Sequence, residues 1–325
     1  MASLPASLVA DLSRLKDLRL SVNEPLSLHT SFGLGGPADL YIEPQTPSAL
    51  AEVIRIVSAA DCPLLVLGRG TNVLVSDEGV RGAVVATHPG LNRIEVHGQR
   101  IVAAAGVLLS RLCHVAADAG LSGLEELAGI PGTVGGALCM NAGANGSAIS
   151  DCLETIAVLD AEGTALSLRR EELTFGYRHA SISENNWCVV EGTFTLTPSS
   201  PAAVHERVYE VLERRCRTQP VGARSAGSIF KRPPGDYAGR LLEAVGAKGL
   251  RIGGAQISPK HANFIINCGD ARAADVLQLI RESQRRVYER FGILLEPEIR
   301  IVGVGVEEFI ASAPGAAGVQ PEGAL

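Results

Sequence analysis

The stretch GIPGTVGGALCMNAGANG, residues 129–146, decides the fold because it cannot pack on itself. Six of its eighteen residues are glycine, and none is charged or aromatic. Glycine permits a positive φ angle and lets the backbone come close to another group. The amides of such a loop can converge on an anion, while Pro131 fixes one corner and Asn141 and Asn145 tolerate left-handed geometry. We interpret the stretch as a ligand cradle; composition alone leaves open a tightly packed loop between strands.

A second glycine turn lies upstream, in the sequence GRGTN at residues 68–72. Apolar runs precede and follow it, so residues 63–85 predict a strand, a glycine turn and another strand. The carboxyl end of a buried strand is where α/β sheets bind ligands. The turn lacks the GxGxxG pattern and no helix follows it, which excludes a Rossmann dinucleotide site and a P-loop here. Alone it is consistent with an ordinary hairpin turn, but together with the cradle it suggests one extended ligand.

The composition excludes several classes of protein. The 325 residues provide enough chain for two or three domains with a sizeable core. With 29 Lys and Arg against 35 Asp and Glu, the net charge of -6 gives no electrostatic footprint for nucleic acid or an anionic membrane. Seven cysteines without a CxxC pair argue against a disulfide framework and a zinc site, so we expect reduced core cysteines and no metal. No signal peptide or membrane span is evident, and we expect a cytoplasmic protein without an obligate protein partner.

The spacing of apolar residues predicts an α+β protein. Helices are expected at residues 6–18, 46–60, 108–119, 202–217, 237–245 and 273–291. Strands or hairpins are expected at residues 38–43, 63–85, 94–105, 153–168, 187–196, 264–267 and 293–302. Thr46 before Pro47 is the N-cap pattern of the second helix, and Asp270 is the expected N-cap of the last one.

A break rich in Pro and Ser at residues 198–201 predicts a domain boundary. We expect a strand-rich domain at residues 1–200, a smaller α+β domain at residues 201–303, and a tail at residues 304–325. The tail from Ala311 onward consists of small residues with Pro and Gly, so we expect its end to be disordered.

Several polar residues leave two interpretations open. His29 could be a ligand, but a lone histidine is more often a hydrogen-bonded structural residue. Tyr177 and Arg178 fall between predicted strands, where an arginine is either a surface residue or a clamp for a carboxylate. Their position alone favours the surface. Glu296 and Glu298 either belong to a site or cap the end of a strand, and the residues alone favour the cap.

Seven motifs along the chain carry a family resemblance. In chain order they are HTSFGLGGPAD, GRGTNVLVSDEG, GLSGLEELAGIPGTVGGALCMNAGANG, FGYRHAS, SAGSIFKRP, KHANFIIN and LEPEIRIVG. The series resembles the UDP-N-acetylenolpyruvoylglucosamine reductase (MurB) family, the flavoenzymes of peptidoglycan synthesis, across residues 20–303. The 50 positions from Arg178 to Ser228 leave no room for the extra substrate loop of the longer family form. The chain is therefore similar to the shorter, second type.

The resemblance implies a fold and a cofactor. It implies a two-lobed FAD-binding domain of the vanillyl-alcohol oxidase (PCMH) type, with lobes at residues 20–87 and 88–200, and a substrate-binding domain at residues 201–303. FAD is then bound without a covalent bond by the two glycine loops. The residues implied for it are Gly68, Arg69, Gly70, Thr71, Asn72, Gly129, Ile130, Pro131, Gly132, Thr133, Gly135 and Gly136.

The resemblance also implies a reaction. NADPH and UDP-N-acetylglucosamine enolpyruvate take turns at the flavin, so that a hydride passes from NADPH to flavin N5 and then to the enolpyruvyl methylene carbon. The family's catalytic residues match Arg178 of FGYR, Ser228 of AGSIF and Glu298 of LEPEIR. An arginine, as a permanent planar cation, suits the carboxylate on which negative charge develops, and a positioned hydroxyl can deliver a proton.

The substrate side departs from the longer family form. Arg232 stands where that form has asparagine, and His261 stands where it has a glutamine near the substrate. Tyr177, Lys231, Arg232 and His261 are the candidates for binding the UDP-sugar.

Two other functions are compatible with the glycine loops. One is a related FAD oxidase that uses oxygen, often with flavin attached through a histidine or a cysteine, and Cys139 lies within the cradle. The other is a nucleotide-binding module that has lost catalysis, against which the presence of Arg178, Ser228 and Glu298 speaks.

Overall fold

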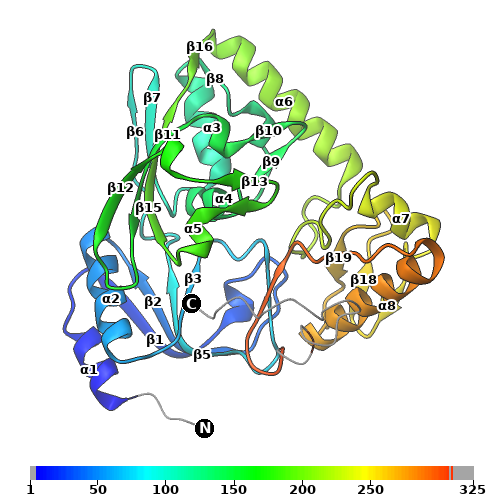
Figure 1. Cartoon of the computed structure of the whole chain (residues 1–325), viewed down its shortest axis with the longest axis horizontal. Helices are drawn as coiled ribbons and strands as arrows, with labels where there is room; N and C mark the ends of the chain where they lie inside the picture. Colours follow the sequence, from blue (N-terminus) through cyan, green and yellow to red (C-terminus); the bar gives the residue numbers. More distant parts are fainter. Residues whose placement is uncertain (1–4, 307–308, 310–325) are drawn as a thin grey trace.

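The computed structural model describes residues 5–306 and 309, which form two lobes and a third domain (Figure 1). The last residues of the expected tail, 310–325, lie outside the described residues, so their disorder stays a prediction. No helix in the described part is long and apolar enough to cross a membrane. In the same part of the chain, no group of three or more His, Cys, Asp or Glu could hold a metal ion.

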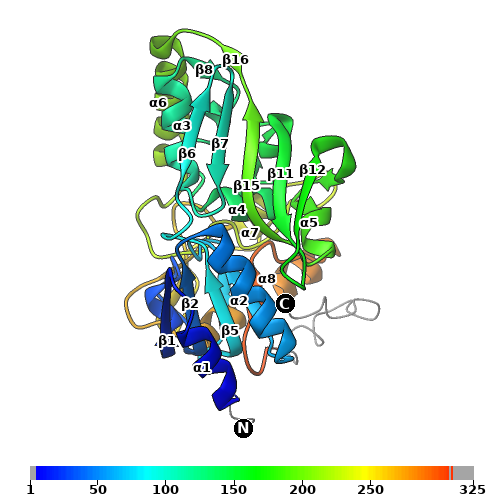
Figure 2. The ribbon, with the colours of Figure 1, turned by 90° about the vertical axis from the view of Figure 1, so that its left-hand side faces the viewer.

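The first lobe is built on a four-stranded sheet of order β1-β2-β5-β3. Its elements are α1 (Ala6–Ser13), β1 (Leu18–Pro25), η1 (Leu26–Leu28), β2 (Pro37–Pro44), α2 (Pro47–Ala59), β3 (Leu64–Leu67), β4 (Val73–Val75) and β5 (Val80–Ala86). Figure 2 shows α1 and α2 lying over one face of this sheet. The apolar side of α2, with Leu50, Val53 and Val57, is buried there, which explains its helical periodicity. As predicted, Thr46 caps this helix, because its Oγ1 accepts a hydrogen bond from the amide of Ala49 at 3.1 Å.

The second lobe is built on a five-stranded antiparallel sheet of order β12-β11-β15-β7-β6, covered by helices (Figure 1). The short strands β8–β16, β9–β10 and β13–β14 form three separate pairs. The strands of this lobe are β6 (Ile94–His97), β7 (Arg100–Ala104), β8 (Leu121–Ser122), β9 (Gly143–Ala144), β10 (Ser147–Ala148), β11 (Leu153–Leu159), β12 (Ala165–Arg169), β13 (Phe175–Gly176), β14 (His179–Ala180), β15 (Cys188–Thr195) and β16 (Thr197–Pro198). Its helices are α3 (Leu109–Asp118), η2 (Glu125–Leu127), α4 (Val134–Cys139), η3 (Ile149–Asp151), η4 (Arg170–Glu172), α5 (Ser181–Glu184) and α6 (Pro201–Thr218). The predicted hairpins at residues 94–105 and 153–168 are confirmed.

Helix α6 corrects the expected domain boundary. Figure 1 shows α6 running along the second lobe toward the third domain. Val208 and Val211 of α6 are buried in the same core as the sheet of the second lobe. Arg207 of α6 also pairs with Glu125 of η2, with Nη2 and Oε1 2.7 Å apart. We therefore place the boundary after Thr218 instead of at residue 201, because by its contacts α6 belongs to the second lobe.

The third domain packs a long helix on a small sheet. Its elements are α7 (Ala238–Ala244), β17 (Arg251–Ile252), β18 (Ala255–Ile257), β19 (Ile265–Asn267) and α8 (Ala273–Phe291), followed by β20 (Arg300–Val302). The bounds of α8 are those that the sequence predicts. Its expected cap is wrong, however, because the first amides of α8, from Ala273 and Ala274, donate to the carboxylate of Asp77 in the first lobe and not to Asp270. This contact fixes the third domain against the first lobe.

Two other expectations near the chain ends need correction. The first helix ends at Ser13 and not at residue 18, because Leu18 already begins β1. The strand expected at residues 293–302 is limited to β20, which pairs in parallel with β4 of the first lobe. Residues 293–299 form no strand but lie beside the Ser228 segment, where Glu296 O accepts a hydrogen bond from the amide of Lys231. Residues 293–299 include apolar residues of the type that favours strands, but their composition does not show that their partners lie far away in the chain.

The cysteines are unpaired, as the sequence predicts, but they are not all in the core. Cys113 and Cys188 are buried, whereas Cys216 and Cys268 are exposed.

Candidate active site

The two glycine loops, residues 68–72 and 129–133, touch each other although they are about 60 positions apart. The hydroxyl of Thr71 donates a hydrogen bond to the carbonyl of Pro131 at 3.1 Å. A Cβ on Gly68 would lie 2.4 Å from Oγ1 of Thr133, so only glycine allows the loops to come this close. The loops therefore form one continuous backbone surface.

This surface carries unpaired amide groups. In the part of the chain that the structure describes, the amides of Gly70, Thr71, Gly132 and Thr133 donate to no protein acceptor. Gly70 and Gly132 have φ angles of 62° and 130°, which disfavour any side chain. Backbone amides left without a partner on one surface are suited to bind an anion.

Gly135 and Gly136 have a different role from the rest of the loop. Both lie in α4, and their amides donate to Ala105 O at 2.9 Å and to Thr133 Oγ1 at 3.3 Å. A Cβ on Gly135 would lie 2.9 Å from Cβ of Ala105. Gly135 therefore lets α4 pack closely on the end of β7, and the amides of Gly135 and Gly136 are not available to a ligand.

Arg178 and Glu298 form a half-buried ion pair beside these loops. Nε of Arg178 donates to Oε1 of Glu298 at 2.6 Å, and Nη1 donates to the carbonyl of Gly143 at 3.1 Å. The side chains are 22% and 12% exposed, so the surface interpretation of Arg178 is wrong. Nη2 of Arg178 makes no hydrogen bond to any described residue. One edge of the guanidinium is thus held, and the other remains for a ligand.

Glu298 is positioned by three segments of the chain. Its amide donates to Ile229 O at 2.7 Å, and its carbonyl accepts from Nδ2 of Asn72 at 3.2 Å. The amide of Arg300 then donates to Asn72 O at 3.0 Å, at the start of the β4–β20 pairing. Glu298 therefore lies between the first glycine loop and the Ser228 segment. A glutamate that only capped the end of a strand would not need contacts with both segments.

Burial raises the pKa of the Glu298 carboxyl, and the nearby cations Arg178 and Lys231 oppose this shift. The net effect is a carboxyl that keeps a proton at higher pH than an exposed glutamate. It is suited both to orient Arg178 and to share a proton with a ligand.

Ser228 lies on a fixed backbone with an unused hydroxyl. It follows Gly227, whose φ is 77°, and it precedes Ile229 and Phe230, which are both buried. The amides of Ile229 and Phe230 donate to the backbone carbonyl and the side-chain Oδ1 of Asn263, at 2.9 and 3.0 Å. The Ser228 hydroxyl itself has no hydrogen-bond partner among the described residues.

Three of the four predicted substrate-side residues lie together. The hydroxyl of Tyr177 accepts a hydrogen bond from the amide of Arg232 at 3.2 Å, and the Arg232 guanidinium lies 4.1 Å from the ring centre of Tyr237. Lys231 pairs with Glu296. Both aromatic rings are more than half exposed. Tyr177, Lys231 and Arg232 thus form an open rim next to Arg178.

His261 stands apart from this rim. Its ring lies against Phe264 and close to Gly239 of α7, and its Nδ1 accepts a hydrogen bond from the amide of Asn263 at 3.2 Å. Burial, with Lys248 nearby, lowers the pKa of this histidine. Within the described residues, no contact joins His261 to Arg178 or Glu298.

His29 is held as a structural residue, as the sequence favours. Its Nε2 lies 2.9 Å from Oε1 of Glu24, and its Nδ1 lies 2.9 Å from the hydroxyl of Tyr41.

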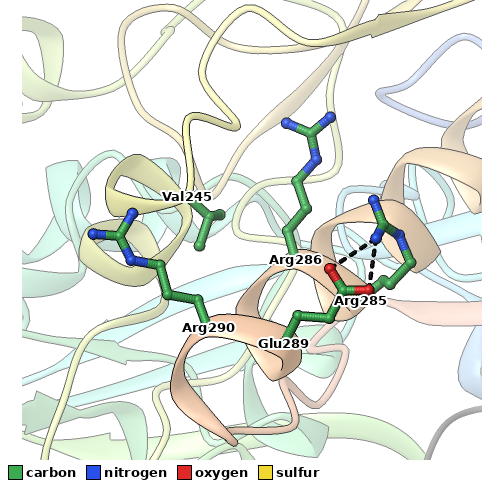
Figure 3. Close-up of a pocket in the computed structure, with 5 residues that line it drawn as sticks. All are labelled: Val245, Arg285, Arg286, Glu289 and Arg290. Carbon is green, nitrogen blue, oxygen red and sulfur yellow. Dashed lines mark hydrogen bonds and ion pairs between the residues drawn. The ribbon is translucent and has the colours of Figure 1, made fainter.

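A shallow pocket on the third domain is a different feature. Figure 3 shows it between the last two turns of α8 and the end of α7. Its lining residues are Val245, Arg285, Arg286, Glu289 and Arg290. Arg285 is bonded to Glu289, and both Arg285 and Arg286 are bonded to Glu282. Arg290 donates to the carbonyl of Ala244. Because each of these arginines already has a hydrogen-bond partner, the pocket does not compete with the Arg178 region as a candidate site.

Comparison with known proteins decides the family. A family model described as the UDP-N-acetylenolpyruvoylglucosamine reductase C-terminal domain matches residues 219–302. A reductase of that name from Moorella thermoacetica is 46% identical over 92% of this chain and 99% of its own length. Another from Exiguobacterium sibiricum is 45% identical over 87% of this chain and 92% of its own. The chain belongs to the UDP-N-acetylenolpyruvoylglucosamine reductase family.

Two further matches concern the fold of this reductase family. The crystal structure of the family enzyme from Thermus caldophilus has a TM-score of 0.75 and 39% identity, covering 87% of this chain and 98% of that one. A model described as an FAD binding domain matches residues 38–169, which include both glycine loops. The α+β fold with an FAD-binding domain, expected from the motifs, is confirmed.

Two residues beside the candidate site of this reductase family were not predicted from the sequence. Asn263 holds the Ser228 segment by hydrogen bonds to Phe230. It lies two positions after His261 in the same motif, where only the histidine was a candidate. Arg215 lies against Gly129 of the second glycine loop. It occurs in the run ERRCR, where no local signal distinguishes one arginine from the next.

Proposed function

We propose that the chain is an FAD-dependent reductase that uses NADPH to convert UDP-N-acetylglucosamine enolpyruvate to UDP-N-acetylmuramate in peptidoglycan synthesis. The Arg178–Glu298 pair, 2.6 Å apart and next to the two glycine loops, carries this proposal for the site. Family membership and the matched FAD binding domain support the reaction and the cofactor.

FAD fits the donors that the two loops offer. Its diphosphate is a dianion, and the unpaired amides of Gly70, Thr71, Gly132 and Thr133 are donors of the kind it needs. We therefore assign residues 68–72 and 129–133 to non-covalent FAD binding. Gly135 supports this loop through the packing of α4, and the amide of Gly136 supports it by its hydrogen bond to Oγ1 of Thr133.

FAD, when bound, supplies hydride transfer from NADPH to the methylene carbon of the enolpyruvyl group. Hydride addition at that carbon leaves negative charge on the neighbouring carbon, which bears the carboxylate. Arg178 is a permanent planar cation, and its free Nη2 edge suits that carboxylate. Glu298 fixes the opposite edge and thereby the orientation of the guanidinium.

Ser228 delivers a proton to the carbon next to the carboxylate in this proposal. A serine hydroxyl is a weak acid, but a carbanion or enolate is a strong base, so a neutral donor at the right place suffices. Asn263 holds the backbone directly after Ser228, at Ile229 and Phe230, and leaves the Ser228 hydroxyl free to donate the proton. Position therefore matters more than acidity.

The rim of Tyr177, Lys231 and Arg232 suits the UDP-sugar, because it combines cations with an exposed ring. His261 is half-buried against Phe264 and Gly239 of α7, so we propose for it a role in shaping the third domain and not a direct contact. NADPH uses the same pocket as the substrate in this proposal. A cytoplasmic location and independence from a protein partner stay predictions.

In the oxidase alternative, the flavin is often attached covalently through a histidine or a cysteine. Burial raises the pKa of the Cys139 thiol to about 11, so this cysteine remains a neutral thiol at pH 7. That argues against covalent attachment through Cys139. The test is to denature the purified protein with acid: FAD should appear in the supernatant, and flavin retained on the polypeptide would favour the oxidase.

Replacing Gly132 by valine should strip the flavin from the protein. Its φ of 130° is strained for any side chain, and a Cβ there would lie 3.0 Å from Oγ1 of Thr71, in the surface that binds the diphosphate. The ratio of flavin to protein absorbance after purification measures the loss, and we expect the variant to be almost colourless.

Gly98→Val is the matched control for backbone strain. Gly98 has a φ of 61° in the β6–β7 turn, and nothing lies within 4 Å of the position of its Cβ. This variant should stay yellow. A fully yellow and active Gly132→Val protein would show that the cradle is misassigned.

A further inference from the structure

Arg215 is a cation beside the second glycine loop that has no acidic partner among the described residues. It lies in the last turn of α6, and a Cβ on Gly129 would lie 2.9 Å from its Cδ and 3.2 Å from its Nε. Gly129 has a φ of 78° and gives the arginine this space. Nε of Arg215 is buried and has no hydrogen-bond partner among the described residues.

The neighbouring arginines of α6 are different. Arg207 pairs with Glu125, and Arg214 pairs with Glu126, each with N and O atoms 2.7 Å apart. The charged groups that act most strongly on Arg215 are Arg214 and Arg178, which are also cations. Burial and these two arginines lower the pKa of Arg215. The structure thus places an uncompensated guanidinium next to the loop.

A buried charge without a partner is unfavourable for the folded chain, so a protein that retains one has a use for it. The amides of Gly132 and Thr133 in the same loop donate to no acceptor among the described residues. One anion bound at this loop could accept hydrogen bonds both from the unpaired amides and from the guanidinium of Arg215.

We propose that Arg215 is a cofactor-binding residue whose guanidinium neutralises an anionic group of FAD at the second glycine loop. This inference rests on the proposed function. FAD offers two groups of the required chemistry, its diphosphate and the N1–C2=O edge of the flavin ring, which gains negative charge on reduction. A charge-assisted hydrogen bond to either group stabilises the bound cofactor.

The test is Arg215→Met, a substitution that keeps an apolar stem of similar length and removes the charge. FAD fluorescence after serial dilution of the holoprotein gives the Kd, which we expect to rise at least ~10-fold. Arg215→Lys should recover part of the affinity, because it restores a point charge without the fork. Arg217→Met, at an exposed position in the same turn, controls for the loss of net charge and should not change the Kd.

Two further measurements distinguish the anionic groups. If Arg215 contacts the diphosphate, the Kd of ADP for the FAD-free protein should rise in the Met variant, as the Kd of FAD does. If it contacts the flavin ring, the midpoint potential of bound flavin should fall in the Met variant. Either result supports the proposal. A Kd within about twofold of wild type together with an unchanged potential would overturn it, and a wild-type protein that binds no FAD would overturn the proposed function itself.

Discussion

Replacing Ser228 by alanine should leave the reduction of bound flavin by NADPH near the wild-type rate and slow its reoxidation by the enolpyruvyl sugar by a factor on the order of 10² or more. The reason is that only the second half-reaction requires a proton at the carbon next to the carboxylate. Stopped-flow absorbance of the flavin measures the two half-reactions separately.

This substitution should remove no hydrogen bond between described residues. The Ser228 hydroxyl has no hydrogen-bond partner among the described residues, and the segment is held through Asn263. A hydroxyl that only capped a turn would cost about 1 kcal/mol of stability on removal, with little change in activity. Ser228→Cys keeps a donor and should recover part of the loss. An alanine variant that reoxidises at the wild-type rate would remove Ser228 from the mechanism.

Arg178→Lys should also slow the substrate half-reaction, by a factor on the order of 10², while the NADPH half-reaction survives better. Nε and Nη1 of Arg178 are held by Glu298 and by Gly143 O, which leaves Nη2 for the carboxylate. A single ammonium cannot make these contacts and also bind the substrate. It will pair with Glu298 at the expense of the ligand.

Arg170→Lys is the matched control for this variant. Arg170 lies in the same lobe, donates to the carbonyls of Ser150 and Leu173, and lies over the ring of Phe175, but it has no place in the site. In the Arg170→Lys variant, the rates of both half-reactions should remain near those of the wild type. Equal losses in both half-reactions of Arg178→Lys would indicate damaged folding or flavin binding and would contradict the role given to Arg178.

Local patterns predicted most of the elements. The capped start of α2, the hairpin strands and the bounds of α8 follow from periodicity and from residues a few positions away. The glycine loops were recognisable for the same reason, since their composition prevents independent packing. The predictions that were wrong concern features whose partners lie far away in the chain. Asp77 caps α8 from 196 positions away, and β20 pairs with β4.

The candidate site also depends on residues that are far apart in the chain. Arg178 and Glu298 are 120 positions apart, so their residues alone favoured a surface arginine and a strand cap. Only the series of family motifs placed them together. The motifs could not show that the amides of Gly135 and Gly136 are used by α4, or that His261 is turned toward Gly239. Those facts depend on packing and not on the order of the residues.

One anaerobic experiment tests the central claim that a single flavin site serves both NADPH and the enolpyruvyl sugar. The purified yellow protein is mixed with one equivalent of NADPH without oxygen, and UDP-N-acetylglucosamine enolpyruvate is then added. The account predicts that NADPH bleaches the flavin, that the sugar restores the yellow colour, and that UDP-N-acetylmuramate forms in equal amount. Flavin that stays bleached until oxygen is admitted would contradict the account.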